Sequence, residues 1–313
     1  MTKPIEDNLE KIPIINILVR IGKKIKIPGL EGMSLYDVLE MYIIGIVRGA
    51  LTTRASGISF SFFMAIFPFM LFILTLIPYI PIEGFQEGLM ALISEILPPK
   101  TFSAVELVLS DIVNNQYGGL LSFGFLFSIF LMTNGVNAIF GGFEYSYHIK
   151  IKEMRNVLKA YFISLAVSLV MSIFLVATVA LTIFFGIGLA KLKERGWLEN
   201  DIFWLQIGRG FLFVGMVFTT VSMLFYYGTK QGKESPFFSA GTIFTTMLSI
   251  LTFYLFSFYV TEFSKYNELY GSIGTLLILM LFIWLNSIIL LLGFELNATI
   301  NCLKRENKVL RNS

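Results

Sequence analysis

The sequence predicts an all-α fold, a polytopic membrane bundle of six transmembrane helices with amphipathic helices at the membrane interface. Hydrophobic residues make up 56% of the chain and its mean hydropathy is +0.76, whereas only 14% of its residues are charged. A soluble domain carries roughly 25% charged residues, and a bilayer core requires about 20 apolar residues in helical form. Six apolar stretches reach that length and are separated by charged loops: residues 55–79, 118–143, 157–190, 202–227, 236–260 and 270–296.

The segment that precedes the membrane domain, residues 1–33, is expected to be basic, amphipathic and cytoplasmic. Its apolar run at 12–21 is short, contains Arg20 and is followed by three lysines. The run has no small-residue cleavage pattern, so it does not predict a removable signal peptide. We expect its lysines to lie among lipid headgroups and its isoleucines to enter the acyl boundary.

An entry helix is predicted next, over residues 34–50. Ser34 and Asp37 have the spacing of a capping box, in which each side chain bonds to the backbone of the other residue. Gly45 and Gly49 lie one helical turn apart and would allow close packing against another helix. A chance pair of glycines in a glycine-rich chain is the alternative.

The distribution of positive charge predicts which side of the membrane each loop occupies. The chain has 24 lysines and arginines, and with six spans most of them fall on the side of the N-terminus. An excess of positive charge marks the cytoplasmic side. Both termini are therefore expected in the cytoplasm, with a membrane domain at 34–300 and a basic tail at 301–313. The opposite loops hold only Lys100, Lys191, Lys193, Arg195 and Lys265.

The first outside loop, at about 80–117, is predicted to be a helical hairpin. Apolar residues recur there at helical spacing in two runs, which predicts helices at 85–97 and 101–113. Pro98 and Pro99 separate the runs. We expect the hairpin to lie at the extracytoplasmic boundary or to cap the bundle, and a surface-packed loop without a functional role is the alternative.

Pro68 lies inside the first predicted span. A proline removes one backbone donor and frees the carbonyl one turn earlier. A kinked or broken helix at this position would line a binding site, as in transporters. The alternative is an ordinary kink that the membrane helix tolerates.

Six polar side chains are expected at bilayer depth, where a polar group is costly and is therefore a candidate for function. One interpretation is a polar cavity open to the cytoplasm, in which Arg54 neutralises Glu144 or Glu295. The alternative is a set of ion pairs and hydrogen bonds that only hold the helices together. The six are three asparagines within spans and three charged residues near cytoplasmic ends: Asn134, Asn137, Asn286, Arg54, Glu144 and Glu295.

Residues that bind metals or activate nucleophiles are scarce in this chain. It has one cysteine, Cys302, and one histidine, His148, which excludes a zinc site built from several such ligands. The stretch 228–233 (GTKQGK) has the wrong spacing for a phosphate-binding loop and no Ser or Thr after its last lysine. We therefore expect no metal, no cofactor and no enzymatic activity. The basic inner loops are explained by positive-inside placement, so they do not indicate nucleic acid.

Three stretches resemble the YihY/BrkB family of bacterial membrane proteins, formerly labelled ribonuclease BN. They are 54–68 (RASGISFSFFMAIFP), 118–124 followed by 134–138, and 266–274 continuing through 293–298 (GFELNA). The resemblance covers about residues 40–300. Asn134 stands where many members carry a basic or other polar residue. The resemblance implies a six-helix protein of the bacterial inner membrane whose biochemical function is unsettled, and these residues do not support the ribonuclease label.

Taken together, the residues favour an integral inner-membrane protein that binds or transports a lipid or another amphiphilic solute. A structural or assembly protein of the cell envelope, acting through the outer hairpin, is the alternative. A ribonuclease is disfavoured because metal-assisted cleavage requires closely grouped metal-binding acids. The expected partners are membrane lipids and an amphiphilic substrate, with a homo-oligomer left open.

Overall fold

The computed structural model describes residues 34–80, 84–96, 99–116, 118–149, 155–194, 201–262 and 272–312. Within these ranges every regular element is a helix, which confirms the all-α fold class. The amphipathic segment expected at 1–33 lies outside the described residues.

Six of the described helices are long and apolar enough to cross a membrane, as the sequence predicts. The first continues as a short 3-10 turn, η1 (Ile77–Tyr79). The last extends well beyond its apolar part. The six helices are α4 (Leu51–Leu76), α7 (Gly118–Glu144), α8 (Val157–Glu194), α9 (Asp201–Gly228), α10 (Ala240–Glu262) and α12 (Ser272–Asn312).

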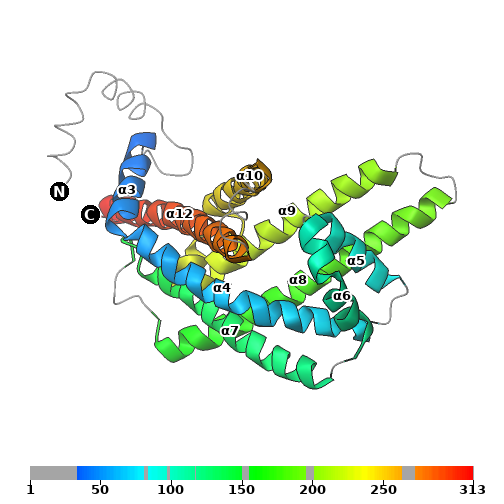
Figure 1. Cartoon of the computed structure of the whole chain (residues 1–313). Helices are drawn as coiled ribbons and strands as arrows, with labels where there is room; N and C mark the ends of the chain where they lie inside the picture. The colour runs from blue at the N-terminus through cyan, green and yellow to red at the C-terminus, as the bar shows by residue number, and fades with distance from the viewer. Residues whose placement is uncertain are drawn as a thin grey trace.

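These six helices form a closed ring in chain order. Each packs against the next one, from α4 to α7, α8, α9, α10 and α12, and α12 packs back against α4. Figure 1 shows α4 running beside α7 and α8 running beside α9. Because the first and last spans meet, every spanning helix has two neighbours and one face directed toward the centre.

A short helix, α3 (Leu35–Arg48), lies against the C-terminal part of α12. We call this side of the bundle the α3 end (Figure 1). The predicted capping box is present, because the Asp37 amide donates to Ser34 Oγ at 3.3 Å and the Ser34 amide donates to Asp37 Oδ2 at 2.8 Å. The cap satisfies backbone donors at the start of α3 and fixes where the helix begins.

At the opposite end, the two helices predicted in the long loop are present as α5 (Phe85–Ile96) and α6 (Pro99–Asn114). Phe85, Leu89 and Val113 are buried in an apolar cluster with residues of η1 and α8. The predicted polar face is also present, since the acidic residues of the hairpin are exposed: Glu87, Glu95, Glu106 and Asp111. The side of the membrane on which this hairpin lies stays a prediction.

Candidate functional site

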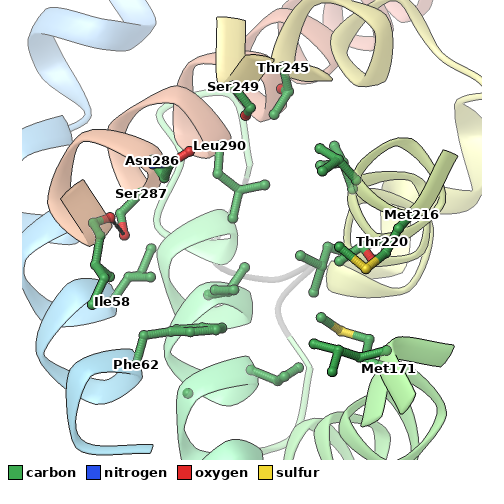
Figure 2. Close-up of a pocket in the computed structure, with 18 of the residues that line it drawn as sticks. Ile58, Phe62, Met171, Met216, Thr220, Thr245, Ser249, Asn286, Ser287 and Leu290 are labelled. Atoms are coloured by element: carbon green, nitrogen blue, oxygen red, sulfur yellow. Dashed lines mark hydrogen bonds between the residues drawn. The ribbon is translucent and has the colours of Figure 1, made fainter. Parts of the chain in front are cut away.

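The ring of helices surrounds a partly open cavity of about 520 Å³, and all six spanning helices contribute to its wall. Figure 2 shows Phe62 of α4, Met171 of α8, Met216 of α9 and Leu290 of α12 around this space. Nearly all of the lining side chains are apolar. The polar ones are neutral: Thr220, Thr245, Ser249, Asn286 and Ser287.

The described helices therefore surround an apolar cavity in place of the polar cavity expected from the sequence. No charged side chain is among the described residues that line it. Asn286 is the one member of the predicted polar set in the wall, and its Nδ2 donates to the Phe282 carbonyl at 2.9 Å. A cavity of this size is within the range of about 300–1,000 Å³ that small-molecule sites occupy.

A layer of aromatic rings closes the cavity toward the α3 end. Ile139 of α7 and Leu290 of α12 line the cavity, and one turn further along these helices lie Phe143 and Phe294. The two rings are stacked with their centroids 4.1 Å apart, and Phe225 of α9 packs edge-on against Phe143 at 5.6 Å. These fully packed rings separate the cavity from the charged residues beyond them.

Beyond that layer, Arg54 and Glu295 form a buried ion pair. Arg54 Nη2 donates to Glu295 Oε1 at 2.7 Å, and the two side chains are 7% and 0% exposed. Arg54 Nη1 donates to the Gly142 carbonyl at 2.8 Å, and Ser146 Oγ donates to Glu295 Oε2 at 2.7 Å. The charges thus neutralise each other and both carboxylate oxygens are bonded, as a buried pair requires.

Glu144, the other carboxylate considered for Arg54, has a different partner. Its Oε1 accepts from the Arg155 amide at 3.2 Å. The Arg155 guanidinium donates to the Tyr227 and Thr229 carbonyls at 2.5 and 2.6 Å, at the C-terminal end of α9. A cation stabilises the negative end of a helix dipole. Burial lowers the pKa of Arg155, and the negative charge of Glu144 opposes that shift.

The entry helix α3 packs directly on the ion pair. A Cβ at Gly45 would lie 2.7 Å from His148 Nε2, and one at Gly49 would lie 2.7 Å from Arg54 Nη2. The two glycines therefore allow α3 to pack closely against these side chains. Tyr42 donates to the Leu292 carbonyl at 3.1 Å. Burial, and to a lesser extent Glu295, raises the pKa of Tyr42 to about 12, so its hydroxyl stays protonated as a donor.

The remaining predicted residues do not meet at one site. Asn137 accepts from Ser164 Oγ at 3.4 Å and so joins α7 to α8. Asn134 is half-buried on α7 and lines neither the cavity nor the ion pair. Pro68 lies inside α4, which runs unbroken from Leu51 to Leu76, so the helix is not broken at this proline.

Asn297 was not among the predicted site residues; it lies on α12, and its side chain reaches the start of α10. Its Oδ1 accepts from the Gly241 amide at 2.8 Å, and its Nδ2 donates to Ser239 Oγ at 2.7 Å. Ser239 Oγ in turn accepts from the Thr242 amide at 3.2 Å, as an N-cap does. The available signal was a polar residue just beyond the last predicted span, in the 293–298 stretch that carries the family resemblance.

The cavity also reaches the outer surface of the ring, between α9 and α10. Phe213 and Phe253 line the cavity, yet they are 37% and 50% exposed. Their ring centroids are 5.4 Å apart. At this position the cavity wall is formed by side chains that are themselves exposed.

No group of three or more histidine, cysteine or acidic residues that could hold a metal ion occurs in the part of the chain that the structure describes. Arg54 and Glu295 bind each other, and Glu144 accepts from the Arg155 amide, so these charged residues already have partners. The chemistry available at the centre of the bundle is therefore apolar contact and hydrogen bonding by neutral side chains.

Comparison with known proteins identifies the family. The profile of a family described as virulence factor BrkB matches residues 45–312. The chain is 30% identical to the putative ribonuclease-like protein YfkH of Bacillus subtilis over 258 residues, which cover 81% of this chain and 91% of that protein. It is 24% identical to a UPF0761 membrane protein of Coxiella burnetii over 257 residues, 80% of this chain and 87% of the relative. No solved structure matches the chain. The protein is therefore an integral membrane protein that belongs to the virulence factor BrkB family.

Proposed function

We propose that this protein binds a lipid or a similar amphiphile in the central cavity and moves it within or across the membrane. The observation that carries the proposal is the cavity of about 520 Å³ whose wall is apolar and is shared by all six spanning helices. An apolar chain that enters this space would replace contacts with bilayer lipid by contacts with side chains such as Phe62, Met171 and Met216. An apolar wall of this kind suits a hydrocarbon chain and does not suit a hydrophilic solute.

The bilayer itself would supply the ligand through the wall between α9 and α10. Phe213 and Phe253 face both the cavity and the surface that lipid would cover. Rotation of two phenyl side chains would open this wall without breaking a backbone hydrogen bond, which is the costly event inside a membrane. A route from the side suits a ligand that already resides in the bilayer.

The role proposed here is non-enzymatic. The described residues of the cavity wall include no carboxylate, imidazole, thiol or amine, so they supply no group for acid–base chemistry near neutral pH. The printed name of the Bacillus subtilis relative is ribonuclease-like, but a cavity of this polarity does not suit RNA. The envelope-assembly alternative has less support, because the outer hairpin buries Phe85, Leu89 and Val113 against its own chain.

Narrowing the cavity tests the proposal. The Met216→Trp substitution should fill part of the cavity with an indole ring, which is larger than the methionine side chain. Binding of a fluorescent phospholipid or fatty-acid probe should weaken by about tenfold or more, because overpacking costs about 1–3 kcal/mol. The matched control is Met247→Trp, since Met247 is 67% exposed on the lipid-facing side of α10. Binding would be measured on purified protein in lipid discs. Equal affinities of the two variants would contradict the proposal.

We further infer that the α3 end faces the cytoplasm of a bacterial cell, with the protein in its inner membrane and both termini inside. The excess of lysine and arginine in the loops on that side supports this orientation. Reporter fusions after Lys152, Lys233 and Arg311 should report a cytoplasmic location, and fusions after Lys100, Arg195 and Lys265 should report the opposite side. One reversed fusion would refute the assigned topology.

A further inference from the structure

One wall of the cavity carries two neutral polar side chains near the middle of the membrane-spanning helices. Ser249 is on α10 and Asn286 is on α12, two helices that pack against each other. In Figure 2 both side chains lie on the same side of the cavity. Each is about ten residues or more from either end of its helix, so both lie deep within the apolar region.

Hydrogen-bonding capacity is left over on this wall. The Asn286 amide nitrogen donates to the Phe282 carbonyl, and since a carbonyl can only accept, this bond fixes the orientation of the amide. Within the described residues no hydrogen bond reaches Asn286 Oδ1 or Ser249 Oγ, and neither atom is buried, so both are accessible from the cavity. A polar atom left unbonded in an apolar site is costly, so these two groups favour a ligand that bonds to them.

The surroundings of this wall disfavour a charged ligand group. No lining residue in the described part of the chain is charged, and the buried cation Arg54 is neutralised by Glu295 beyond the layer of Phe143 and Phe294. An ionised headgroup drawn to the middle of the bundle would have no counter-charge. Such a group is among the most costly to bury in a membrane.

From these contacts we infer that the ligand of the cavity is an uncharged lipid alcohol, whose free hydroxyl lies between Ser249 and Asn286. The inference rests on the proposed function. Asn286 Oδ1 can only accept, so the ligand must donate a hydrogen, and Ser249 can donate in return to an oxygen of the ligand. The oxygen of a hydroxyl group can donate its hydrogen to Asn286 Oδ1 and accept a hydrogen bond from Ser249 Oγ at the same time. An ester or ether oxygen can only accept, and it would leave Asn286 unbonded.

The test compares three probes with identical acyl chains: a photoactivatable diacylglycerol, its acetylated analogue, in which the hydroxyl is blocked, and the corresponding phosphatidic acid. Binding to the full-length protein in lipid discs is measured by dose-dependent cross-linking. The diacylglycerol is expected to bind about tenfold more tightly than either of the others, as expected when one or two hydrogen bonds are lost. Peptide mapping should place the cross-links on α10 and α12.

Substitutions on the wall give the second arm. Ser249→Ala and Asn286→Leu should reduce the preference for diacylglycerol over its acetylated analogue toward unity, while binding of the acetylated analogue is retained. That retained binding shows that the variants are folded. Ser61→Ala is the matched control, because Ser61 bonds to the Gly57 carbonyl of its own helix and does not line the cavity.

The outcomes separate this inference from the proposed function. Equal binding of diacylglycerol and its acetylated analogue, or tighter binding of phosphatidic acid, would overturn the assignment of a lipid alcohol while leaving a lipid-binding cavity in place. A preference that survives in both wall variants would overturn the role of Ser249 and Asn286. Failure of all three probes to bind would overturn the proposed function itself.

Discussion

Replacing Glu295 with alanine is expected to remove most of the folded protein from the membrane. The substitution leaves the Arg54 guanidinium buried at 7% exposure without its carboxylate, and it also removes the acceptor of Ser146 Oγ. Breaking a buried ion pair by removing one partner costs about 3–5 kcal/mol. That is a large part of the roughly 5–15 kcal/mol that stabilises a typical protein. Arg54→Ala should have a similar effect, since it leaves the carboxylate unpaired.

The measurement is the yield and the thermal midpoint of the detergent-extracted protein on size-exclusion chromatography. Lys304→Ala is the control, because Lys304 is an exposed charge on the same helix as Glu295. The double variant Arg54→Leu, Glu295→Leu should recover part of the loss, since it leaves no unpaired ion in the bundle. A normal yield of the Glu295→Ala variant would show that the pair contributes little to stability.

The sequence predicted that Arg54 pairs with a carboxylate, but it did not decide between Glu144 and Glu295. Hydropathy and the cost of an unpaired ion placed Arg54, Glu144 and Glu295 at similar depth. Depth alone does not say which way a side chain points around its helix. In the structure Glu295 faces α4, and Glu144 faces the start of α8, where Arg155 lies. The difference depends on how each helix is rotated about its own axis. Spans that are apolar on nearly every face have no sequence periodicity that would reveal this rotation.

The cavity was not predictable for a related reason. In a soluble helix, polar and apolar faces distinguish the outside from the core. In a membrane helix, lipid and cavity both accept the same side chains, so Met216 in the cavity wall and Met247 on the outer surface look alike in the sequence. The six spans, the hairpin helices and the capping box were predictable because each depends on local spacing. The closure of the ring between α4 and α12 is a tertiary property.

The role of Gly293 likewise emerged only from the packing of α10 against α12. A Cβ at this position would lie 1.7 Å from Thr245 Oγ1, 3.1 Å from Thr245 Cβ and 2.8 Å from the Gly241 carbonyl oxygen. Gly241 is constrained in turn, since a Cβ there would lie 2.2 Å from the Gly293 carbonyl oxygen. The two glycines allow the backbones to approach closely, and this approach lets Asn297 reach the first turn of α10.

Gly293→Ala is therefore expected to lower the thermal midpoint sharply, because the added methyl group must displace a backbone atom as well as the Thr245 hydroxyl. Overpacking costs about 1–3 kcal/mol where side chains alone adjust, and here the loss of the Asn297 bond to the Gly241 amide would add to it. Gly215→Ala is the matched control. A Cβ at Gly215 meets nothing within 4 Å, so that variant should be as stable as the parent or slightly more stable. The double variant Gly293→Ala, Thr245→Ala should recover only part of the lost stability, since the Gly241 carbonyl oxygen would still clash with the added methyl group.

If Gly293→Ala and Gly215→Ala have the same thermal midpoint, the α10–α12 crossing is looser than the structure indicates, and the wall that carries Ser249 and Asn286 is not rigidly held.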